Sequence, residues 1–427
     1  MREGKEMYNW ARDIFPICRS ITGKGVRDTL KYFKNIVPEL EIKNVKTGEK
    51  FGDWEVPYEW NIDDAYILDP NNNKIIDFKL NNLHLWGYSE PIDKTLDLNE
   101  LQNHLYSLED YPDVIPYVTS YYDKTWGFCI SHNQRKTLKK GKYKVVIKSS
   151  LTDGELNYGE IILKGKSKKE ILISSYICHP SMGNNELSGP CVLISLVKNY
   201  LKELDRDFTY RLVLIPETIG SVIYINKHLN HLKKNVFCGL NLSCVGDNKS
   251  YSYLKSRNGN TFSDKVANYL INQYYPETNV FSYLSRGSDE RNYCWPGVDL
   301  PIISLMRTKY GAYKEYHTSD DNLEFISPEG LQGGYEINLN FLKIVSLNKL
   351  YKSTTIGEPF LSRHGLRNKR KGNEPLDLNS TSIINFLVYS DGRNDLIDIC
   401  EKTGIDLLSF HKTINLLVEK KIVDEKK

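Results

Sequence analysis

The sequence predicts an α/β protein in which a mostly parallel sheet is flanked by helices, and three observations support this fold class. The chain of 427 residues is 40% hydrophobic and 26% charged, which is typical of a folded protein of about two to four domains. Beyond residue 150, apolar runs that suit buried strands alternate with segments of helical periodicity. Polar clusters directly follow several of these runs. This order predicts a parallel sheet covered by helices on both faces.

The first 150 residues divide into two parts of different character. Residues 5–36 carry apolar side chains at helical spacing, interrupted by a polar turn at 20–25, and predict two helices. Residues 48–150 contain short aromatic-rich runs broken by turns such as the Asp-Pro-Asn-Asn-Asn segment, which predicts a small β-rich unit. We expect the N-terminal helices to join the later α/β domain, so the β-rich unit is an insertion.

The alternation of strands and helices runs from residue 151 to residue 355. Together with residues 1–47, this segment predicts one α/β domain around the insertion. Its expected strands are 156–164, 170–177, 210–215, 236–244 and 300–306. Its expected helices are 189–204, 221–232, 262–275 and 328–347.

The C-terminal residues predict a basic linker followed by a winged helix-turn-helix. Residues 356–379 are rich in Lys and Arg and lack apolar periodicity. The domain expected at 380–427 contains a tight turn around Gly404 and a short wing. Its three amphipathic helices are expected at 380–389, 394–403 and 407–419.

Two partners suit this C-terminal domain. His411 and Lys412 on the expected recognition helix could contact phosphates, which favours DNA. The same helix carries Asp406 and Glu419 at its ends and little Arg, so its positive charge is low for binding a DNA duplex. Protein contact or homo-oligomerisation is therefore slightly favoured, and DNA binding stays open.

Charge and hydropathy limit the remaining partners. Lys and Arg number 57 and Asp and Glu 54, so the net charge of +3 gives no global argument for nucleic acid or membrane binding. No apolar run approaches the length of a membrane span, and the first residues lack the apolar core of a secretory signal. The eight cysteines are scattered without a CxxC pair. We expect a cytoplasmic protein with reduced thiols and no membrane partner.

Four polar clusters follow expected strands or precede expected helices. They contain His179, Glu217, the charged segment 286–293, and His317 with Asp321. Open α/β folds place their ligands at the carboxyl edge of the sheet, where these clusters are expected to meet. Two histidines and a carboxylate form the inventory of a metal-hydrolase site.

Each cluster also has a structural interpretation. A histidine after a strand is more often a hydrogen-bonded structural residue than a ligand, and a Ser/Asp/Asn cluster before a helix is usually a cap. Glu217 could be solvated, and His317 with Asp321 could form a cap and a surface pair. The pattern by itself leaves both interpretations open.

The order of the motifs resembles the bacterial zinc exo-aminopeptidase superfamily. More narrowly, it resembles the aminopeptidase-like proteins of unknown function that have an inserted β-rich domain and a C-terminal winged helix, often linked to polysaccharide gene clusters. The resemblance covers nearly the whole chain. It is carried by His179-Pro with Asn184-Asn-Glu-Leu-Ser-Gly, Pro216-Glu-Thr-Ile-Gly, Ser288-Asp-Glu-Arg and Tyr316-His-Thr-Ser-Asp-Asp-Asn.

The resemblance implies roles for residues of this chain. His179 and His317 match the zinc-binding histidines, and Glu217 matches the general base. Three further ligand positions of the active enzymes, including the bridging Asp, fall on neutral residues: Asn185, Thr218 and Ser243.

Neutral side chains cannot hold two cations close together, because only anionic bridging ligands offset their repulsion. We therefore expect at most one zinc, bound by His179 and His317. Its remaining positions would be filled by Asn185, Glu186, Glu217 or water.

The same clusters supply the expected substrate contacts. An acid could hold a substrate amine, and Arg291 could hold a carboxylate or phosphate. The alternative for the segment at 289–293 is an internal ion-pair network. The residues expected to bind substrate are Glu186, Asp289, Glu290, Arg291, Tyr293 and Asp321.

Two functions follow from these expectations. The first is a metal-dependent hydrolase of an amide-linked small molecule or peptide, with a degenerate single-zinc site and Glu217 as base. The second is a catalytically inactive ligand-binding or regulatory protein, in which the winged helix contacts DNA or a partner protein.

Overall fold

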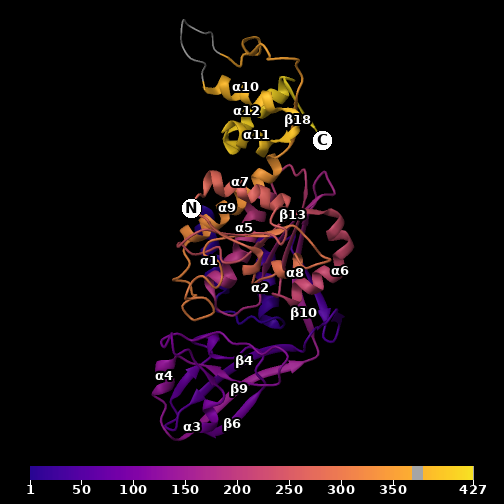
Figure 1. Ribbon diagram of the computed structural model, residues 1–427. Coiled ribbons are helices and arrows are strands. Elements are labelled where there is room, and N and C mark those ends of the chain that lie inside the picture. The colour runs from indigo at the N-terminus through magenta and orange to yellow at the C-terminus, as the bar shows by residue number, and fades with distance from the viewer. Residues whose placement is uncertain (368–377, 427) are drawn as a thin grey trace. The chain divides into compact units, whose positions relative to one another are not determined.

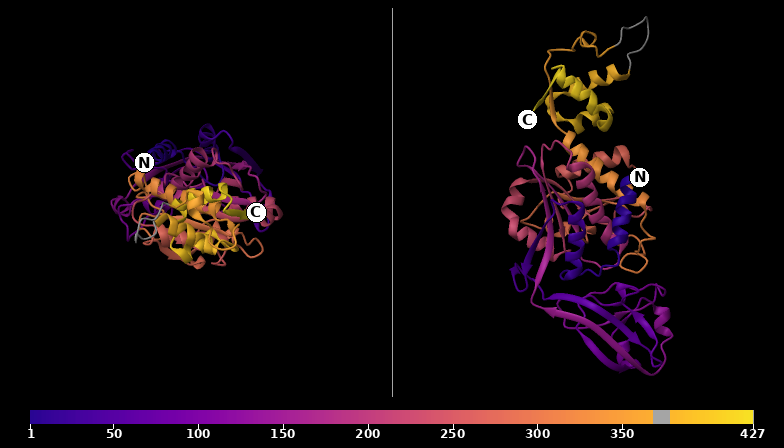
Figure 2. Two further views of the ribbon diagram at one scale, coloured as in Figure 1. Left: turned by 90° about the horizontal axis from the view of Figure 1, so that it is seen from above. Right: turned by 180° about the vertical axis from the view of Figure 1, so that it is seen from behind.

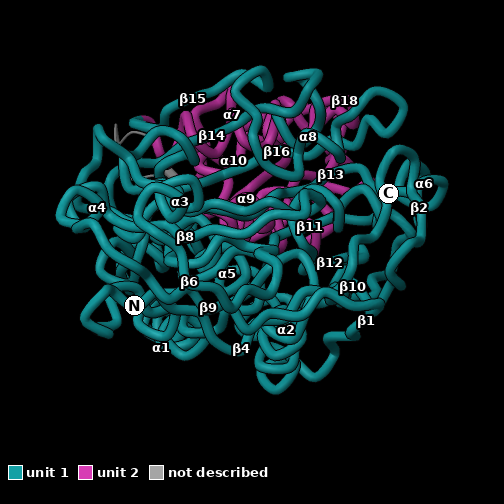
Figure 3. Tube along the Cα trace, turned by 90° about the horizontal axis from the view of Figure 1, so that it is seen from below, with its two compact units in different colours: residues 1–264, 277–337 teal, residues 265–276, 338–427 magenta. Residues whose placement is uncertain are grey.

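The structure is a computed structural model that describes residues 1–367 and 378–426. It contains two compact units, and each is described by itself (Figure 3). Unit 1 comprises residues 1–264 and 277–337, and unit 2 comprises residues 265–276 and 338–427.

An eight-stranded sheet forms the centre of unit 1. Four neighbouring strands in its middle run parallel, and antiparallel pairs join β10 to β12 and β14 to β16. The strand order is β1-β10-β12-β11-β13-β16-β14-β15. The strands are β1 (Glu41–Lys46), β10 (Glu155–Leu163), β11 (Glu170–Tyr176), β12 (Thr209–Ile215), β13 (Val236–Leu242), β14 (Ser252–Leu254), β15 (Asn279–Phe281) and β16 (Ile302–Met306).

The central strands are continuously apolar because both faces of the sheet are covered. Every residue of β11, β12 and β16 is buried. Helices lie on both sides of this sheet (Figures 1 and 2). The helices of unit 1 are α1 (Arg2–Ile14), α2 (Lys24–Ile36), α3 (Leu98–Gln102), α4 (His132–Lys136), α5 (Ser188–Leu196), α6 (Ile219–Asn235) and α8 (Glu290–Tyr293).

The predicted fold class is confirmed, with one difference in detail. The N-terminal segment does belong to the main sheet, because β1 pairs with β10 along its whole length. The pairs β1–β10, β10–β12 and β14–β16 are antiparallel, however, within a sheet that the alternating pattern predicted to be mostly parallel. Strand β10 follows the insertion rather than a crossover helix, so nothing in its connection requires a parallel partner.

The helix after β11 is not regular at its start. A π-helical turn (Gly183–Leu187) precedes α5, and a second π-helical turn (Val197–Leu201) follows it. π-Helical turns are rare in proteins, but a large share of those that occur lie at functional sites. Gly183 is required here, because a Cβ at this position would lie 2.5 Å from the carbonyl oxygen of Asn322.

A four-stranded antiparallel sheet of order β5-β4-β9-β6 lies in the segment predicted to be an insertion. Its core contains Trp60, Ala65, Phe128, Val145 and Ile147. The strands of this segment are β2 (Lys50–Phe51), β3 (Trp54–Glu55), β4 (Glu59–Leu68), β5 (Lys74–Asp77), β6 (Ile92–Asp97), β7 (Leu105–Tyr106), β8 (Phe128–Cys129) and β9 (Lys142–Thr152).

Unit 2 contains a three-stranded antiparallel sheet of order β18-β17-β19 and three short helices. Gly404 ends α11 in the left-handed conformation, at φ 70°, which makes the predicted tight turn. The strands are β17 (Leu350–Ser353), β18 (Asp391–Asp395) and β19 (Val423–Lys426). The helices are α10 (Leu378–Tyr389), α11 (Leu396–Thr403) and α12 (Leu407–Glu419), and α7 (Phe262–Tyr274) and α9 (Pro328–Leu347) cross the division between the units.

The structure bears on three further expectations, which concern residues 350–353, the linker and membrane spans. Strand β17 joins the C-terminal sheet, although the sequence placed residues 350–353 in the α/β domain. Part of the expected linker, residues 368–377, lies outside the described residues. No helix among the described residues is long and apolar enough to cross a membrane.

Candidate active site

The loops that follow three parallel strands meet at one cavity of unit 1, which has a volume of about 490 Å³. We call it the histidine cavity. His179 follows β11, Glu217 and Thr218 follow β12, and His317 lies in the loop before α9. Its walls are completed by Ile21, Trp54, Tyr117, Thr119, Tyr121, Tyr122, Ile219, Arg291 and Asn292. The structure thus brings His179, Glu217, Arg291 and His317 together.

The two imidazole rings and one carboxylate lie close to each other in this cavity. The ring centroids of His179 and His317 are 5.4 Å apart. The Nε2 atom of His179 lies 3.6 Å from a carboxylate oxygen of Glu217. The ring of Tyr117 packs against both histidines, with centroid distances of 5.2 and 5.1 Å.

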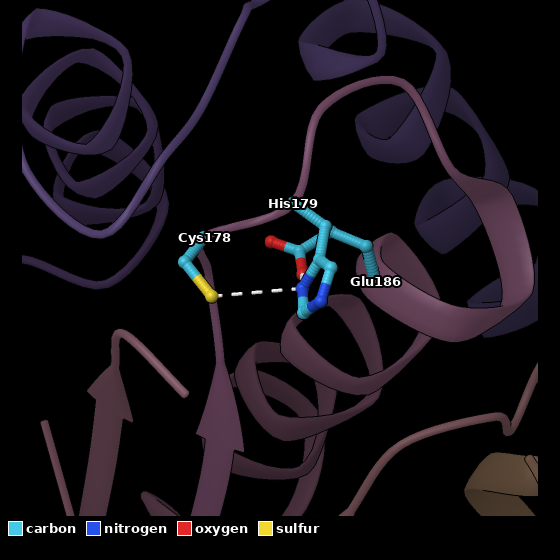
Figure 4. Close-up of side chains that lie close together, drawn as sticks. All are labelled: Cys178, His179 and Glu186. Carbon is cyan, nitrogen blue, oxygen red and sulfur yellow. Dashed lines mark hydrogen bonds and ion pairs between the residues drawn. The ribbon is translucent and has the colours of Figure 1, made fainter. Parts of the chain in front are cut away.

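His179 is held by a buried carboxylate from the π-helical turn. Its Nδ1 atom lies 2.9 Å from Oε2 of Glu186 (Figure 4). The Nε atom of Arg19 donates to the carbonyl oxygen of His179 at 3.0 Å and lies 3.5 Å from the second oxygen of Glu186. An Nδ1 proton shared with Glu186 leaves Nε2 as the acceptor that faces the cavity.

Burial sets the protonation states of these groups. It lowers the pKa of His179 to about 3, an effect increased by the charge of Arg19. Burial, followed by the neighbouring His179, lowers the pKa of His317 to about 3. Burial and the charge of Asp289 raise the pKa of Glu217 to about 8, although Arg291 opposes this shift. The imidazoles are therefore neutral near pH 7, and Glu217 can take up and release a proton.

Unsatisfied polar atoms concentrate around this cavity. Seven buried side-chain nitrogen or oxygen atoms of this region have no hydrogen-bond partner among the described residues. Buried polar atoms are normally paired, so such a cluster indicates a place for a ligand, an ion or water. The seven residues are Arg19, Asn185, Glu186, Ser243, Asp289, Arg291 and His317.

Backbone strain concentrates here as well. Nine described residues other than glycine have a positive φ; one of them is the wall residue Tyr121, and four more lie in the loops at this edge of the sheet. Such conformations persist only where the surrounding structure enforces them, and they cluster at functional sites. The four residues are Ser181, Thr218, Cys244 and His317.

Cys178, His179 and Glu186 are the one group of three ligand-type side chains that lies within 4.8 Å in the described part of the chain (Figure 4). This group does not suit a metal. Burial raises the pKa of the Cys178 thiol well above its usual value, which disfavours the thiolate that binds metals. The Arg19 guanidinium also lies beside Glu186, and its positive charge would repel a metal ion bound there. We interpret Glu186 as a support for His179.

The donor set inside the histidine cavity does suit one zinc ion. Nε2 of His317 is buried without a partner, and Nε2 of His179 faces the same space with only Glu217 near it. Neutral imidazoles are common zinc ligands, and a site with few protein ligands leaves positions for water and substrate. A second zinc lacks a bridging carboxylate, because Asn185, Thr218 and Ser243 are neutral.

The expected ligand Asn185 does not line the histidine cavity. Its Oδ1 atom, the one that would bind a metal, accepts a hydrogen bond of 2.9 Å from the Tyr176 hydroxyl. Asp321 accepts hydrogen bonds from the backbone amides of Asn184 and Asn185, at 2.6 and 2.9 Å. Asp321 therefore fixes the π-helical turn and, contrary to our expectation, does not face a substrate.

Of the residues expected to bind substrate, only Arg291 lines the cavity. Its guanidinium contacts the Thr218 hydroxyl, and its Nε atom has no partner among the described residues. Asp289 accepts from the Thr218 amide at 2.8 Å and from Ser221 at 2.6 Å.

Glu290 and Tyr293 also point away from the cavity. Glu290 accepts hydrogen bonds from the amides of Gly287 and Ser288 and from Asn241. The Tyr293 hydroxyl lies 3.0 Å from the Ser174 hydroxyl, inside the core. In the segment at 289–293, Asp289, Glu290 and Tyr293 therefore make internal hydrogen bonds to neutral groups, and the described residues show no ion pair of the expected network there.

Tyr117 was not predicted from the sequence. This residue comes from the segment between β7 and β8, far from the histidines in the chain. Its amide donates to the carbonyl oxygen of His317 at 2.9 Å, and the Ser319 amide donates to Ile115 at 2.8 Å. Arg19 was missed too, although it adjoins the polar turn between the first two helices.

Fold and site together define the class of this protein. The mixed sheet flanked by helices is the fold of the aminopeptidase-like α/β proteins. The structure is similar to that of a zinc aminopeptidase from Bacillus subtilis, with a TM-score of 0.58, 12% identity and coverage of 80% of this chain and 95% of that chain. At this identity the similarity shows the fold alone.

The chain belongs to the family described as domain of unknown function DUF4910, whose model matches residues 8–348, and a winged helix-turn-helix model matches residues 349–425. A Clostridium acetobutylicum protein, named as a polysaccharide biosynthesis protein with an aminopeptidase-like domain, is 41% identical over 404 residues, covering 94% of this chain and 92% of that protein. A crystal structure of a peptidase-like protein from the same organism has a TM-score of 0.93 and 38% identity, covering 99% of this chain and 96% of that chain.

Proposed function

We propose that this protein hydrolyses an amide bond in a small molecule or peptide, using one zinc ion held by His179 and His317. One observation carries the proposal: two neutral, buried imidazoles and a carboxylate of raised pKa face a single cavity. This combination supplies neutral metal ligands and a general base in one place.

Each residue has a defined task in this reaction. Zinc, when bound, would polarise the amide carbonyl and make water more acidic. Glu217 accepts a proton from the attacking water and returns it to the amine that leaves as the C–N bond breaks. Glu186 and Arg19 keep Nε2 of His179 directed into the cavity. The free Nε of Arg291 suits a carboxylate or phosphate of the substrate.

The substrate class draws on the relatives. The Clostridium acetobutylicum protein is named for polysaccharide biosynthesis, which favours an amide on a sugar intermediate. With no candidate membrane span among the described helices, we propose action on a water-dissolved substrate in the cytoplasm.

A second function is favoured by a specific observation. Neutral residues occupy three positions where the active enzymes carry zinc ligands, which suits a site that binds a ligand without turning it over. The winged helix would then report occupancy to DNA or to a partner protein. DNA binding predicts an affinity that falls steeply with added salt, and a flat response would exclude it.

Metal content tests the proposal directly. Elemental analysis of untagged protein should give about one zinc per chain, and both His179→Ala and His317→Ala should lose it. The control is His228→Ala, because this half-buried histidine on α6 packs on Tyr224 and does not line the cavity. Glu217→Gln should retain the zinc but lose hydrolysis by about 10²- to 10⁴-fold. Protein that binds no zinc even after its addition would overturn the proposal and support the regulator.

A further inference from the structure

A second cavity adjoins the histidine cavity and is larger, at about 650 Å³. We call it the tyrosine cavity. It shares two wall residues, Tyr121 and Tyr122, with the histidine cavity. Its lining comes from β3, from the ends of β9, and from the segment between β7 and β8.

A third cavity of about 390 Å³ adjoins the histidine cavity through Trp54 and Asn292. It also contains the exposed ring of Trp295. The three cavities therefore form a row in which neighbouring cavities share wall residues. The two histidines and Glu217 line the middle cavity. A substrate can extend in both directions from these groups, so the site is built for a chain and not for a single small molecule.

The tyrosine cavity combines aromatic faces with negative charge. Tyr58 and Tyr122 are 54% and 51% exposed, so their rings are available for contact. Its charged residues are four acids against one lysine: Glu55, Glu90, Asp123, Asp153 and Lys124. Among the described residues, Glu55 pairs with Lys50 at 3.6 Å, and no ion pair involves Glu90, Asp123 or Asp153.

The walls of this cavity are fixed before any ligand binds. Tyr88 stacks on Trp60 with a centroid distance of 5.7 Å and meets the ring of Tyr121 edge-on at 5.6 Å. The Tyr88 hydroxyl lies 2.6 Å from that of Thr22, and the Tyr122 hydroxyl donates to the carbonyl oxygen of Glu55 at 2.7 Å. Such preorganisation reduces the entropy lost on binding.

This chemistry selects one kind of ligand. Exposed tyrosine faces pack against the flat apolar faces of sugar rings, and carboxylates accept hydrogen bonds from hydroxyl and ammonium groups. Unpaired carboxylates beside aromatic faces also favour cations and repel anions. A basic peptide shares the charge but not the stacked rings.

We infer that the tyrosine cavity binds the free amino sugars of an oligosaccharide whose N-acylated unit lies in the histidine cavity. The substrate class is thus a partly N-acylated amino-sugar oligomer. This inference rests on the proposed amide hydrolysis, which would release the acyl group as a carboxylate and leave one more free amine on the sugar, with one water consumed.

Calorimetric titration tests the binding without any turnover. The probe is a tetramer of β-1,4-linked glucosamine, compared with its fully N-acetylated form, a cellotetraose and a tetralysine peptide. We expect the glucosamine tetramer to bind at least about tenfold more tightly than each of the three others. Equal or tighter binding of tetralysine would assign the cavity to basic peptides, and a preference for either neutral sugar would overturn the inference.

Variants separate charge from stacking. The double change Glu90→Gln with Asp123→Asn should weaken the glucosamine tetramer about tenfold and leave the N-acetylated form unchanged. Tyr122→Ala should weaken both sugars. The control is Asp110→Asn, because this exposed acid lines none of the three cavities. If the double variant binds like the wild type, the inference fails.

These readouts distinguish the inference from the proposed function. Preferred binding of the glucosamine tetramer without zinc or hydrolysis would retain the inference and reject the hydrolase. Zinc-dependent hydrolysis of a simple N-acyl glucosamine, without preferred binding of the glucosamine tetramer, would retain the hydrolase and reject the inference.

Discussion

Unit 1 contains two buried clusters of charged residues on the same sheet, and they differ in how completely their hydrogen bonds are made. In the first, Arg211 of β12 donates to Glu170 at 2.7 Å and to Glu160 at 2.8 Å, and His231 also contacts Glu170 at 2.8 Å. None of these side chains has a buried polar atom without a partner.

The second cluster surrounds the histidine cavity, where partners are missing. Asp289, Arg291 and His317 each keep one buried polar atom without a hydrogen-bond partner among the described residues. Burial also raises the pKa of Glu217 to about 8, whereas Arg211 and His231 overcome burial and hold the pKa of Glu170 below its usual value. The first cluster stabilises the fold, whereas the second leaves buried polar groups without partners at the expense of stability.

The largest effect on stability is expected when one Glu in each cluster is replaced by Gln. Glu170→Gln should destabilise unit 1 by about 2 kcal/mol, because Arg211 loses one of its two charged acceptors in a buried place. Glu217→Gln should stabilise it by about 1 kcal/mol, because a carboxylate that burial disfavours is removed. Denaturant unfolding of chelator-treated protein measures both. Equal losses in the two variants would break the comparison.

The contributions of Glu170 and Glu217 to stability should depend on pH in opposite ways. The folded pKa of Glu170 is lowered, so its contribution is present above the unfolded value of about 4.3 and is lost as pH falls through the folded pKa. The folded pKa of Glu217 is raised to about 8, so its penalty is absent below about pH 4.3 and grows until pH 8. Unfolding midpoints of both variants and the wild type, measured from pH 4 to 9, should therefore show the advantage of Glu217→Gln increasing with pH. A constant advantage would assign it to packing.

A smaller effect separates two buried serines. Ser263 donates to the carbonyl oxygen of Pro301 at 2.6 Å, whereas the Ser243 hydroxyl has no partner among the described residues. Ser263→Ala should cost about 1 kcal/mol, and Ser243→Ala should change stability by less than about 0.5 kcal/mol. Thermal unfolding is sensitive enough to resolve the two. A clear loss for Ser243→Ala would mean that its hydroxyl holds water that supports the fold.

The sequence was sufficient for the parts of the site that follow strands. His179 and Glu217 come directly after apolar runs, and the carboxyl ends of parallel strands share an edge, so their meeting was predictable. The direction of a side chain within a short helix was not, which is why Glu290 and Tyr293 were placed in the cavity. Tyr117 could not be predicted, because it contacts His317 across about 200 residues of chain and no local pattern encodes that contact.

The loop that carries Tyr117 is bonded to the loop that carries His317. The amides of Tyr117 and Ser319 donate across this junction to carbonyl oxygens, and the Ile115 amide donates to the Ser319 hydroxyl. The aromatic wall and the histidine must consequently be inherited together. In a chimaera that takes residues 48–150 from a relative, the exchange would preserve the cavity only if residues 315–319 were exchanged as well, so substrate range in this family should evolve by paired replacement of two distant segments.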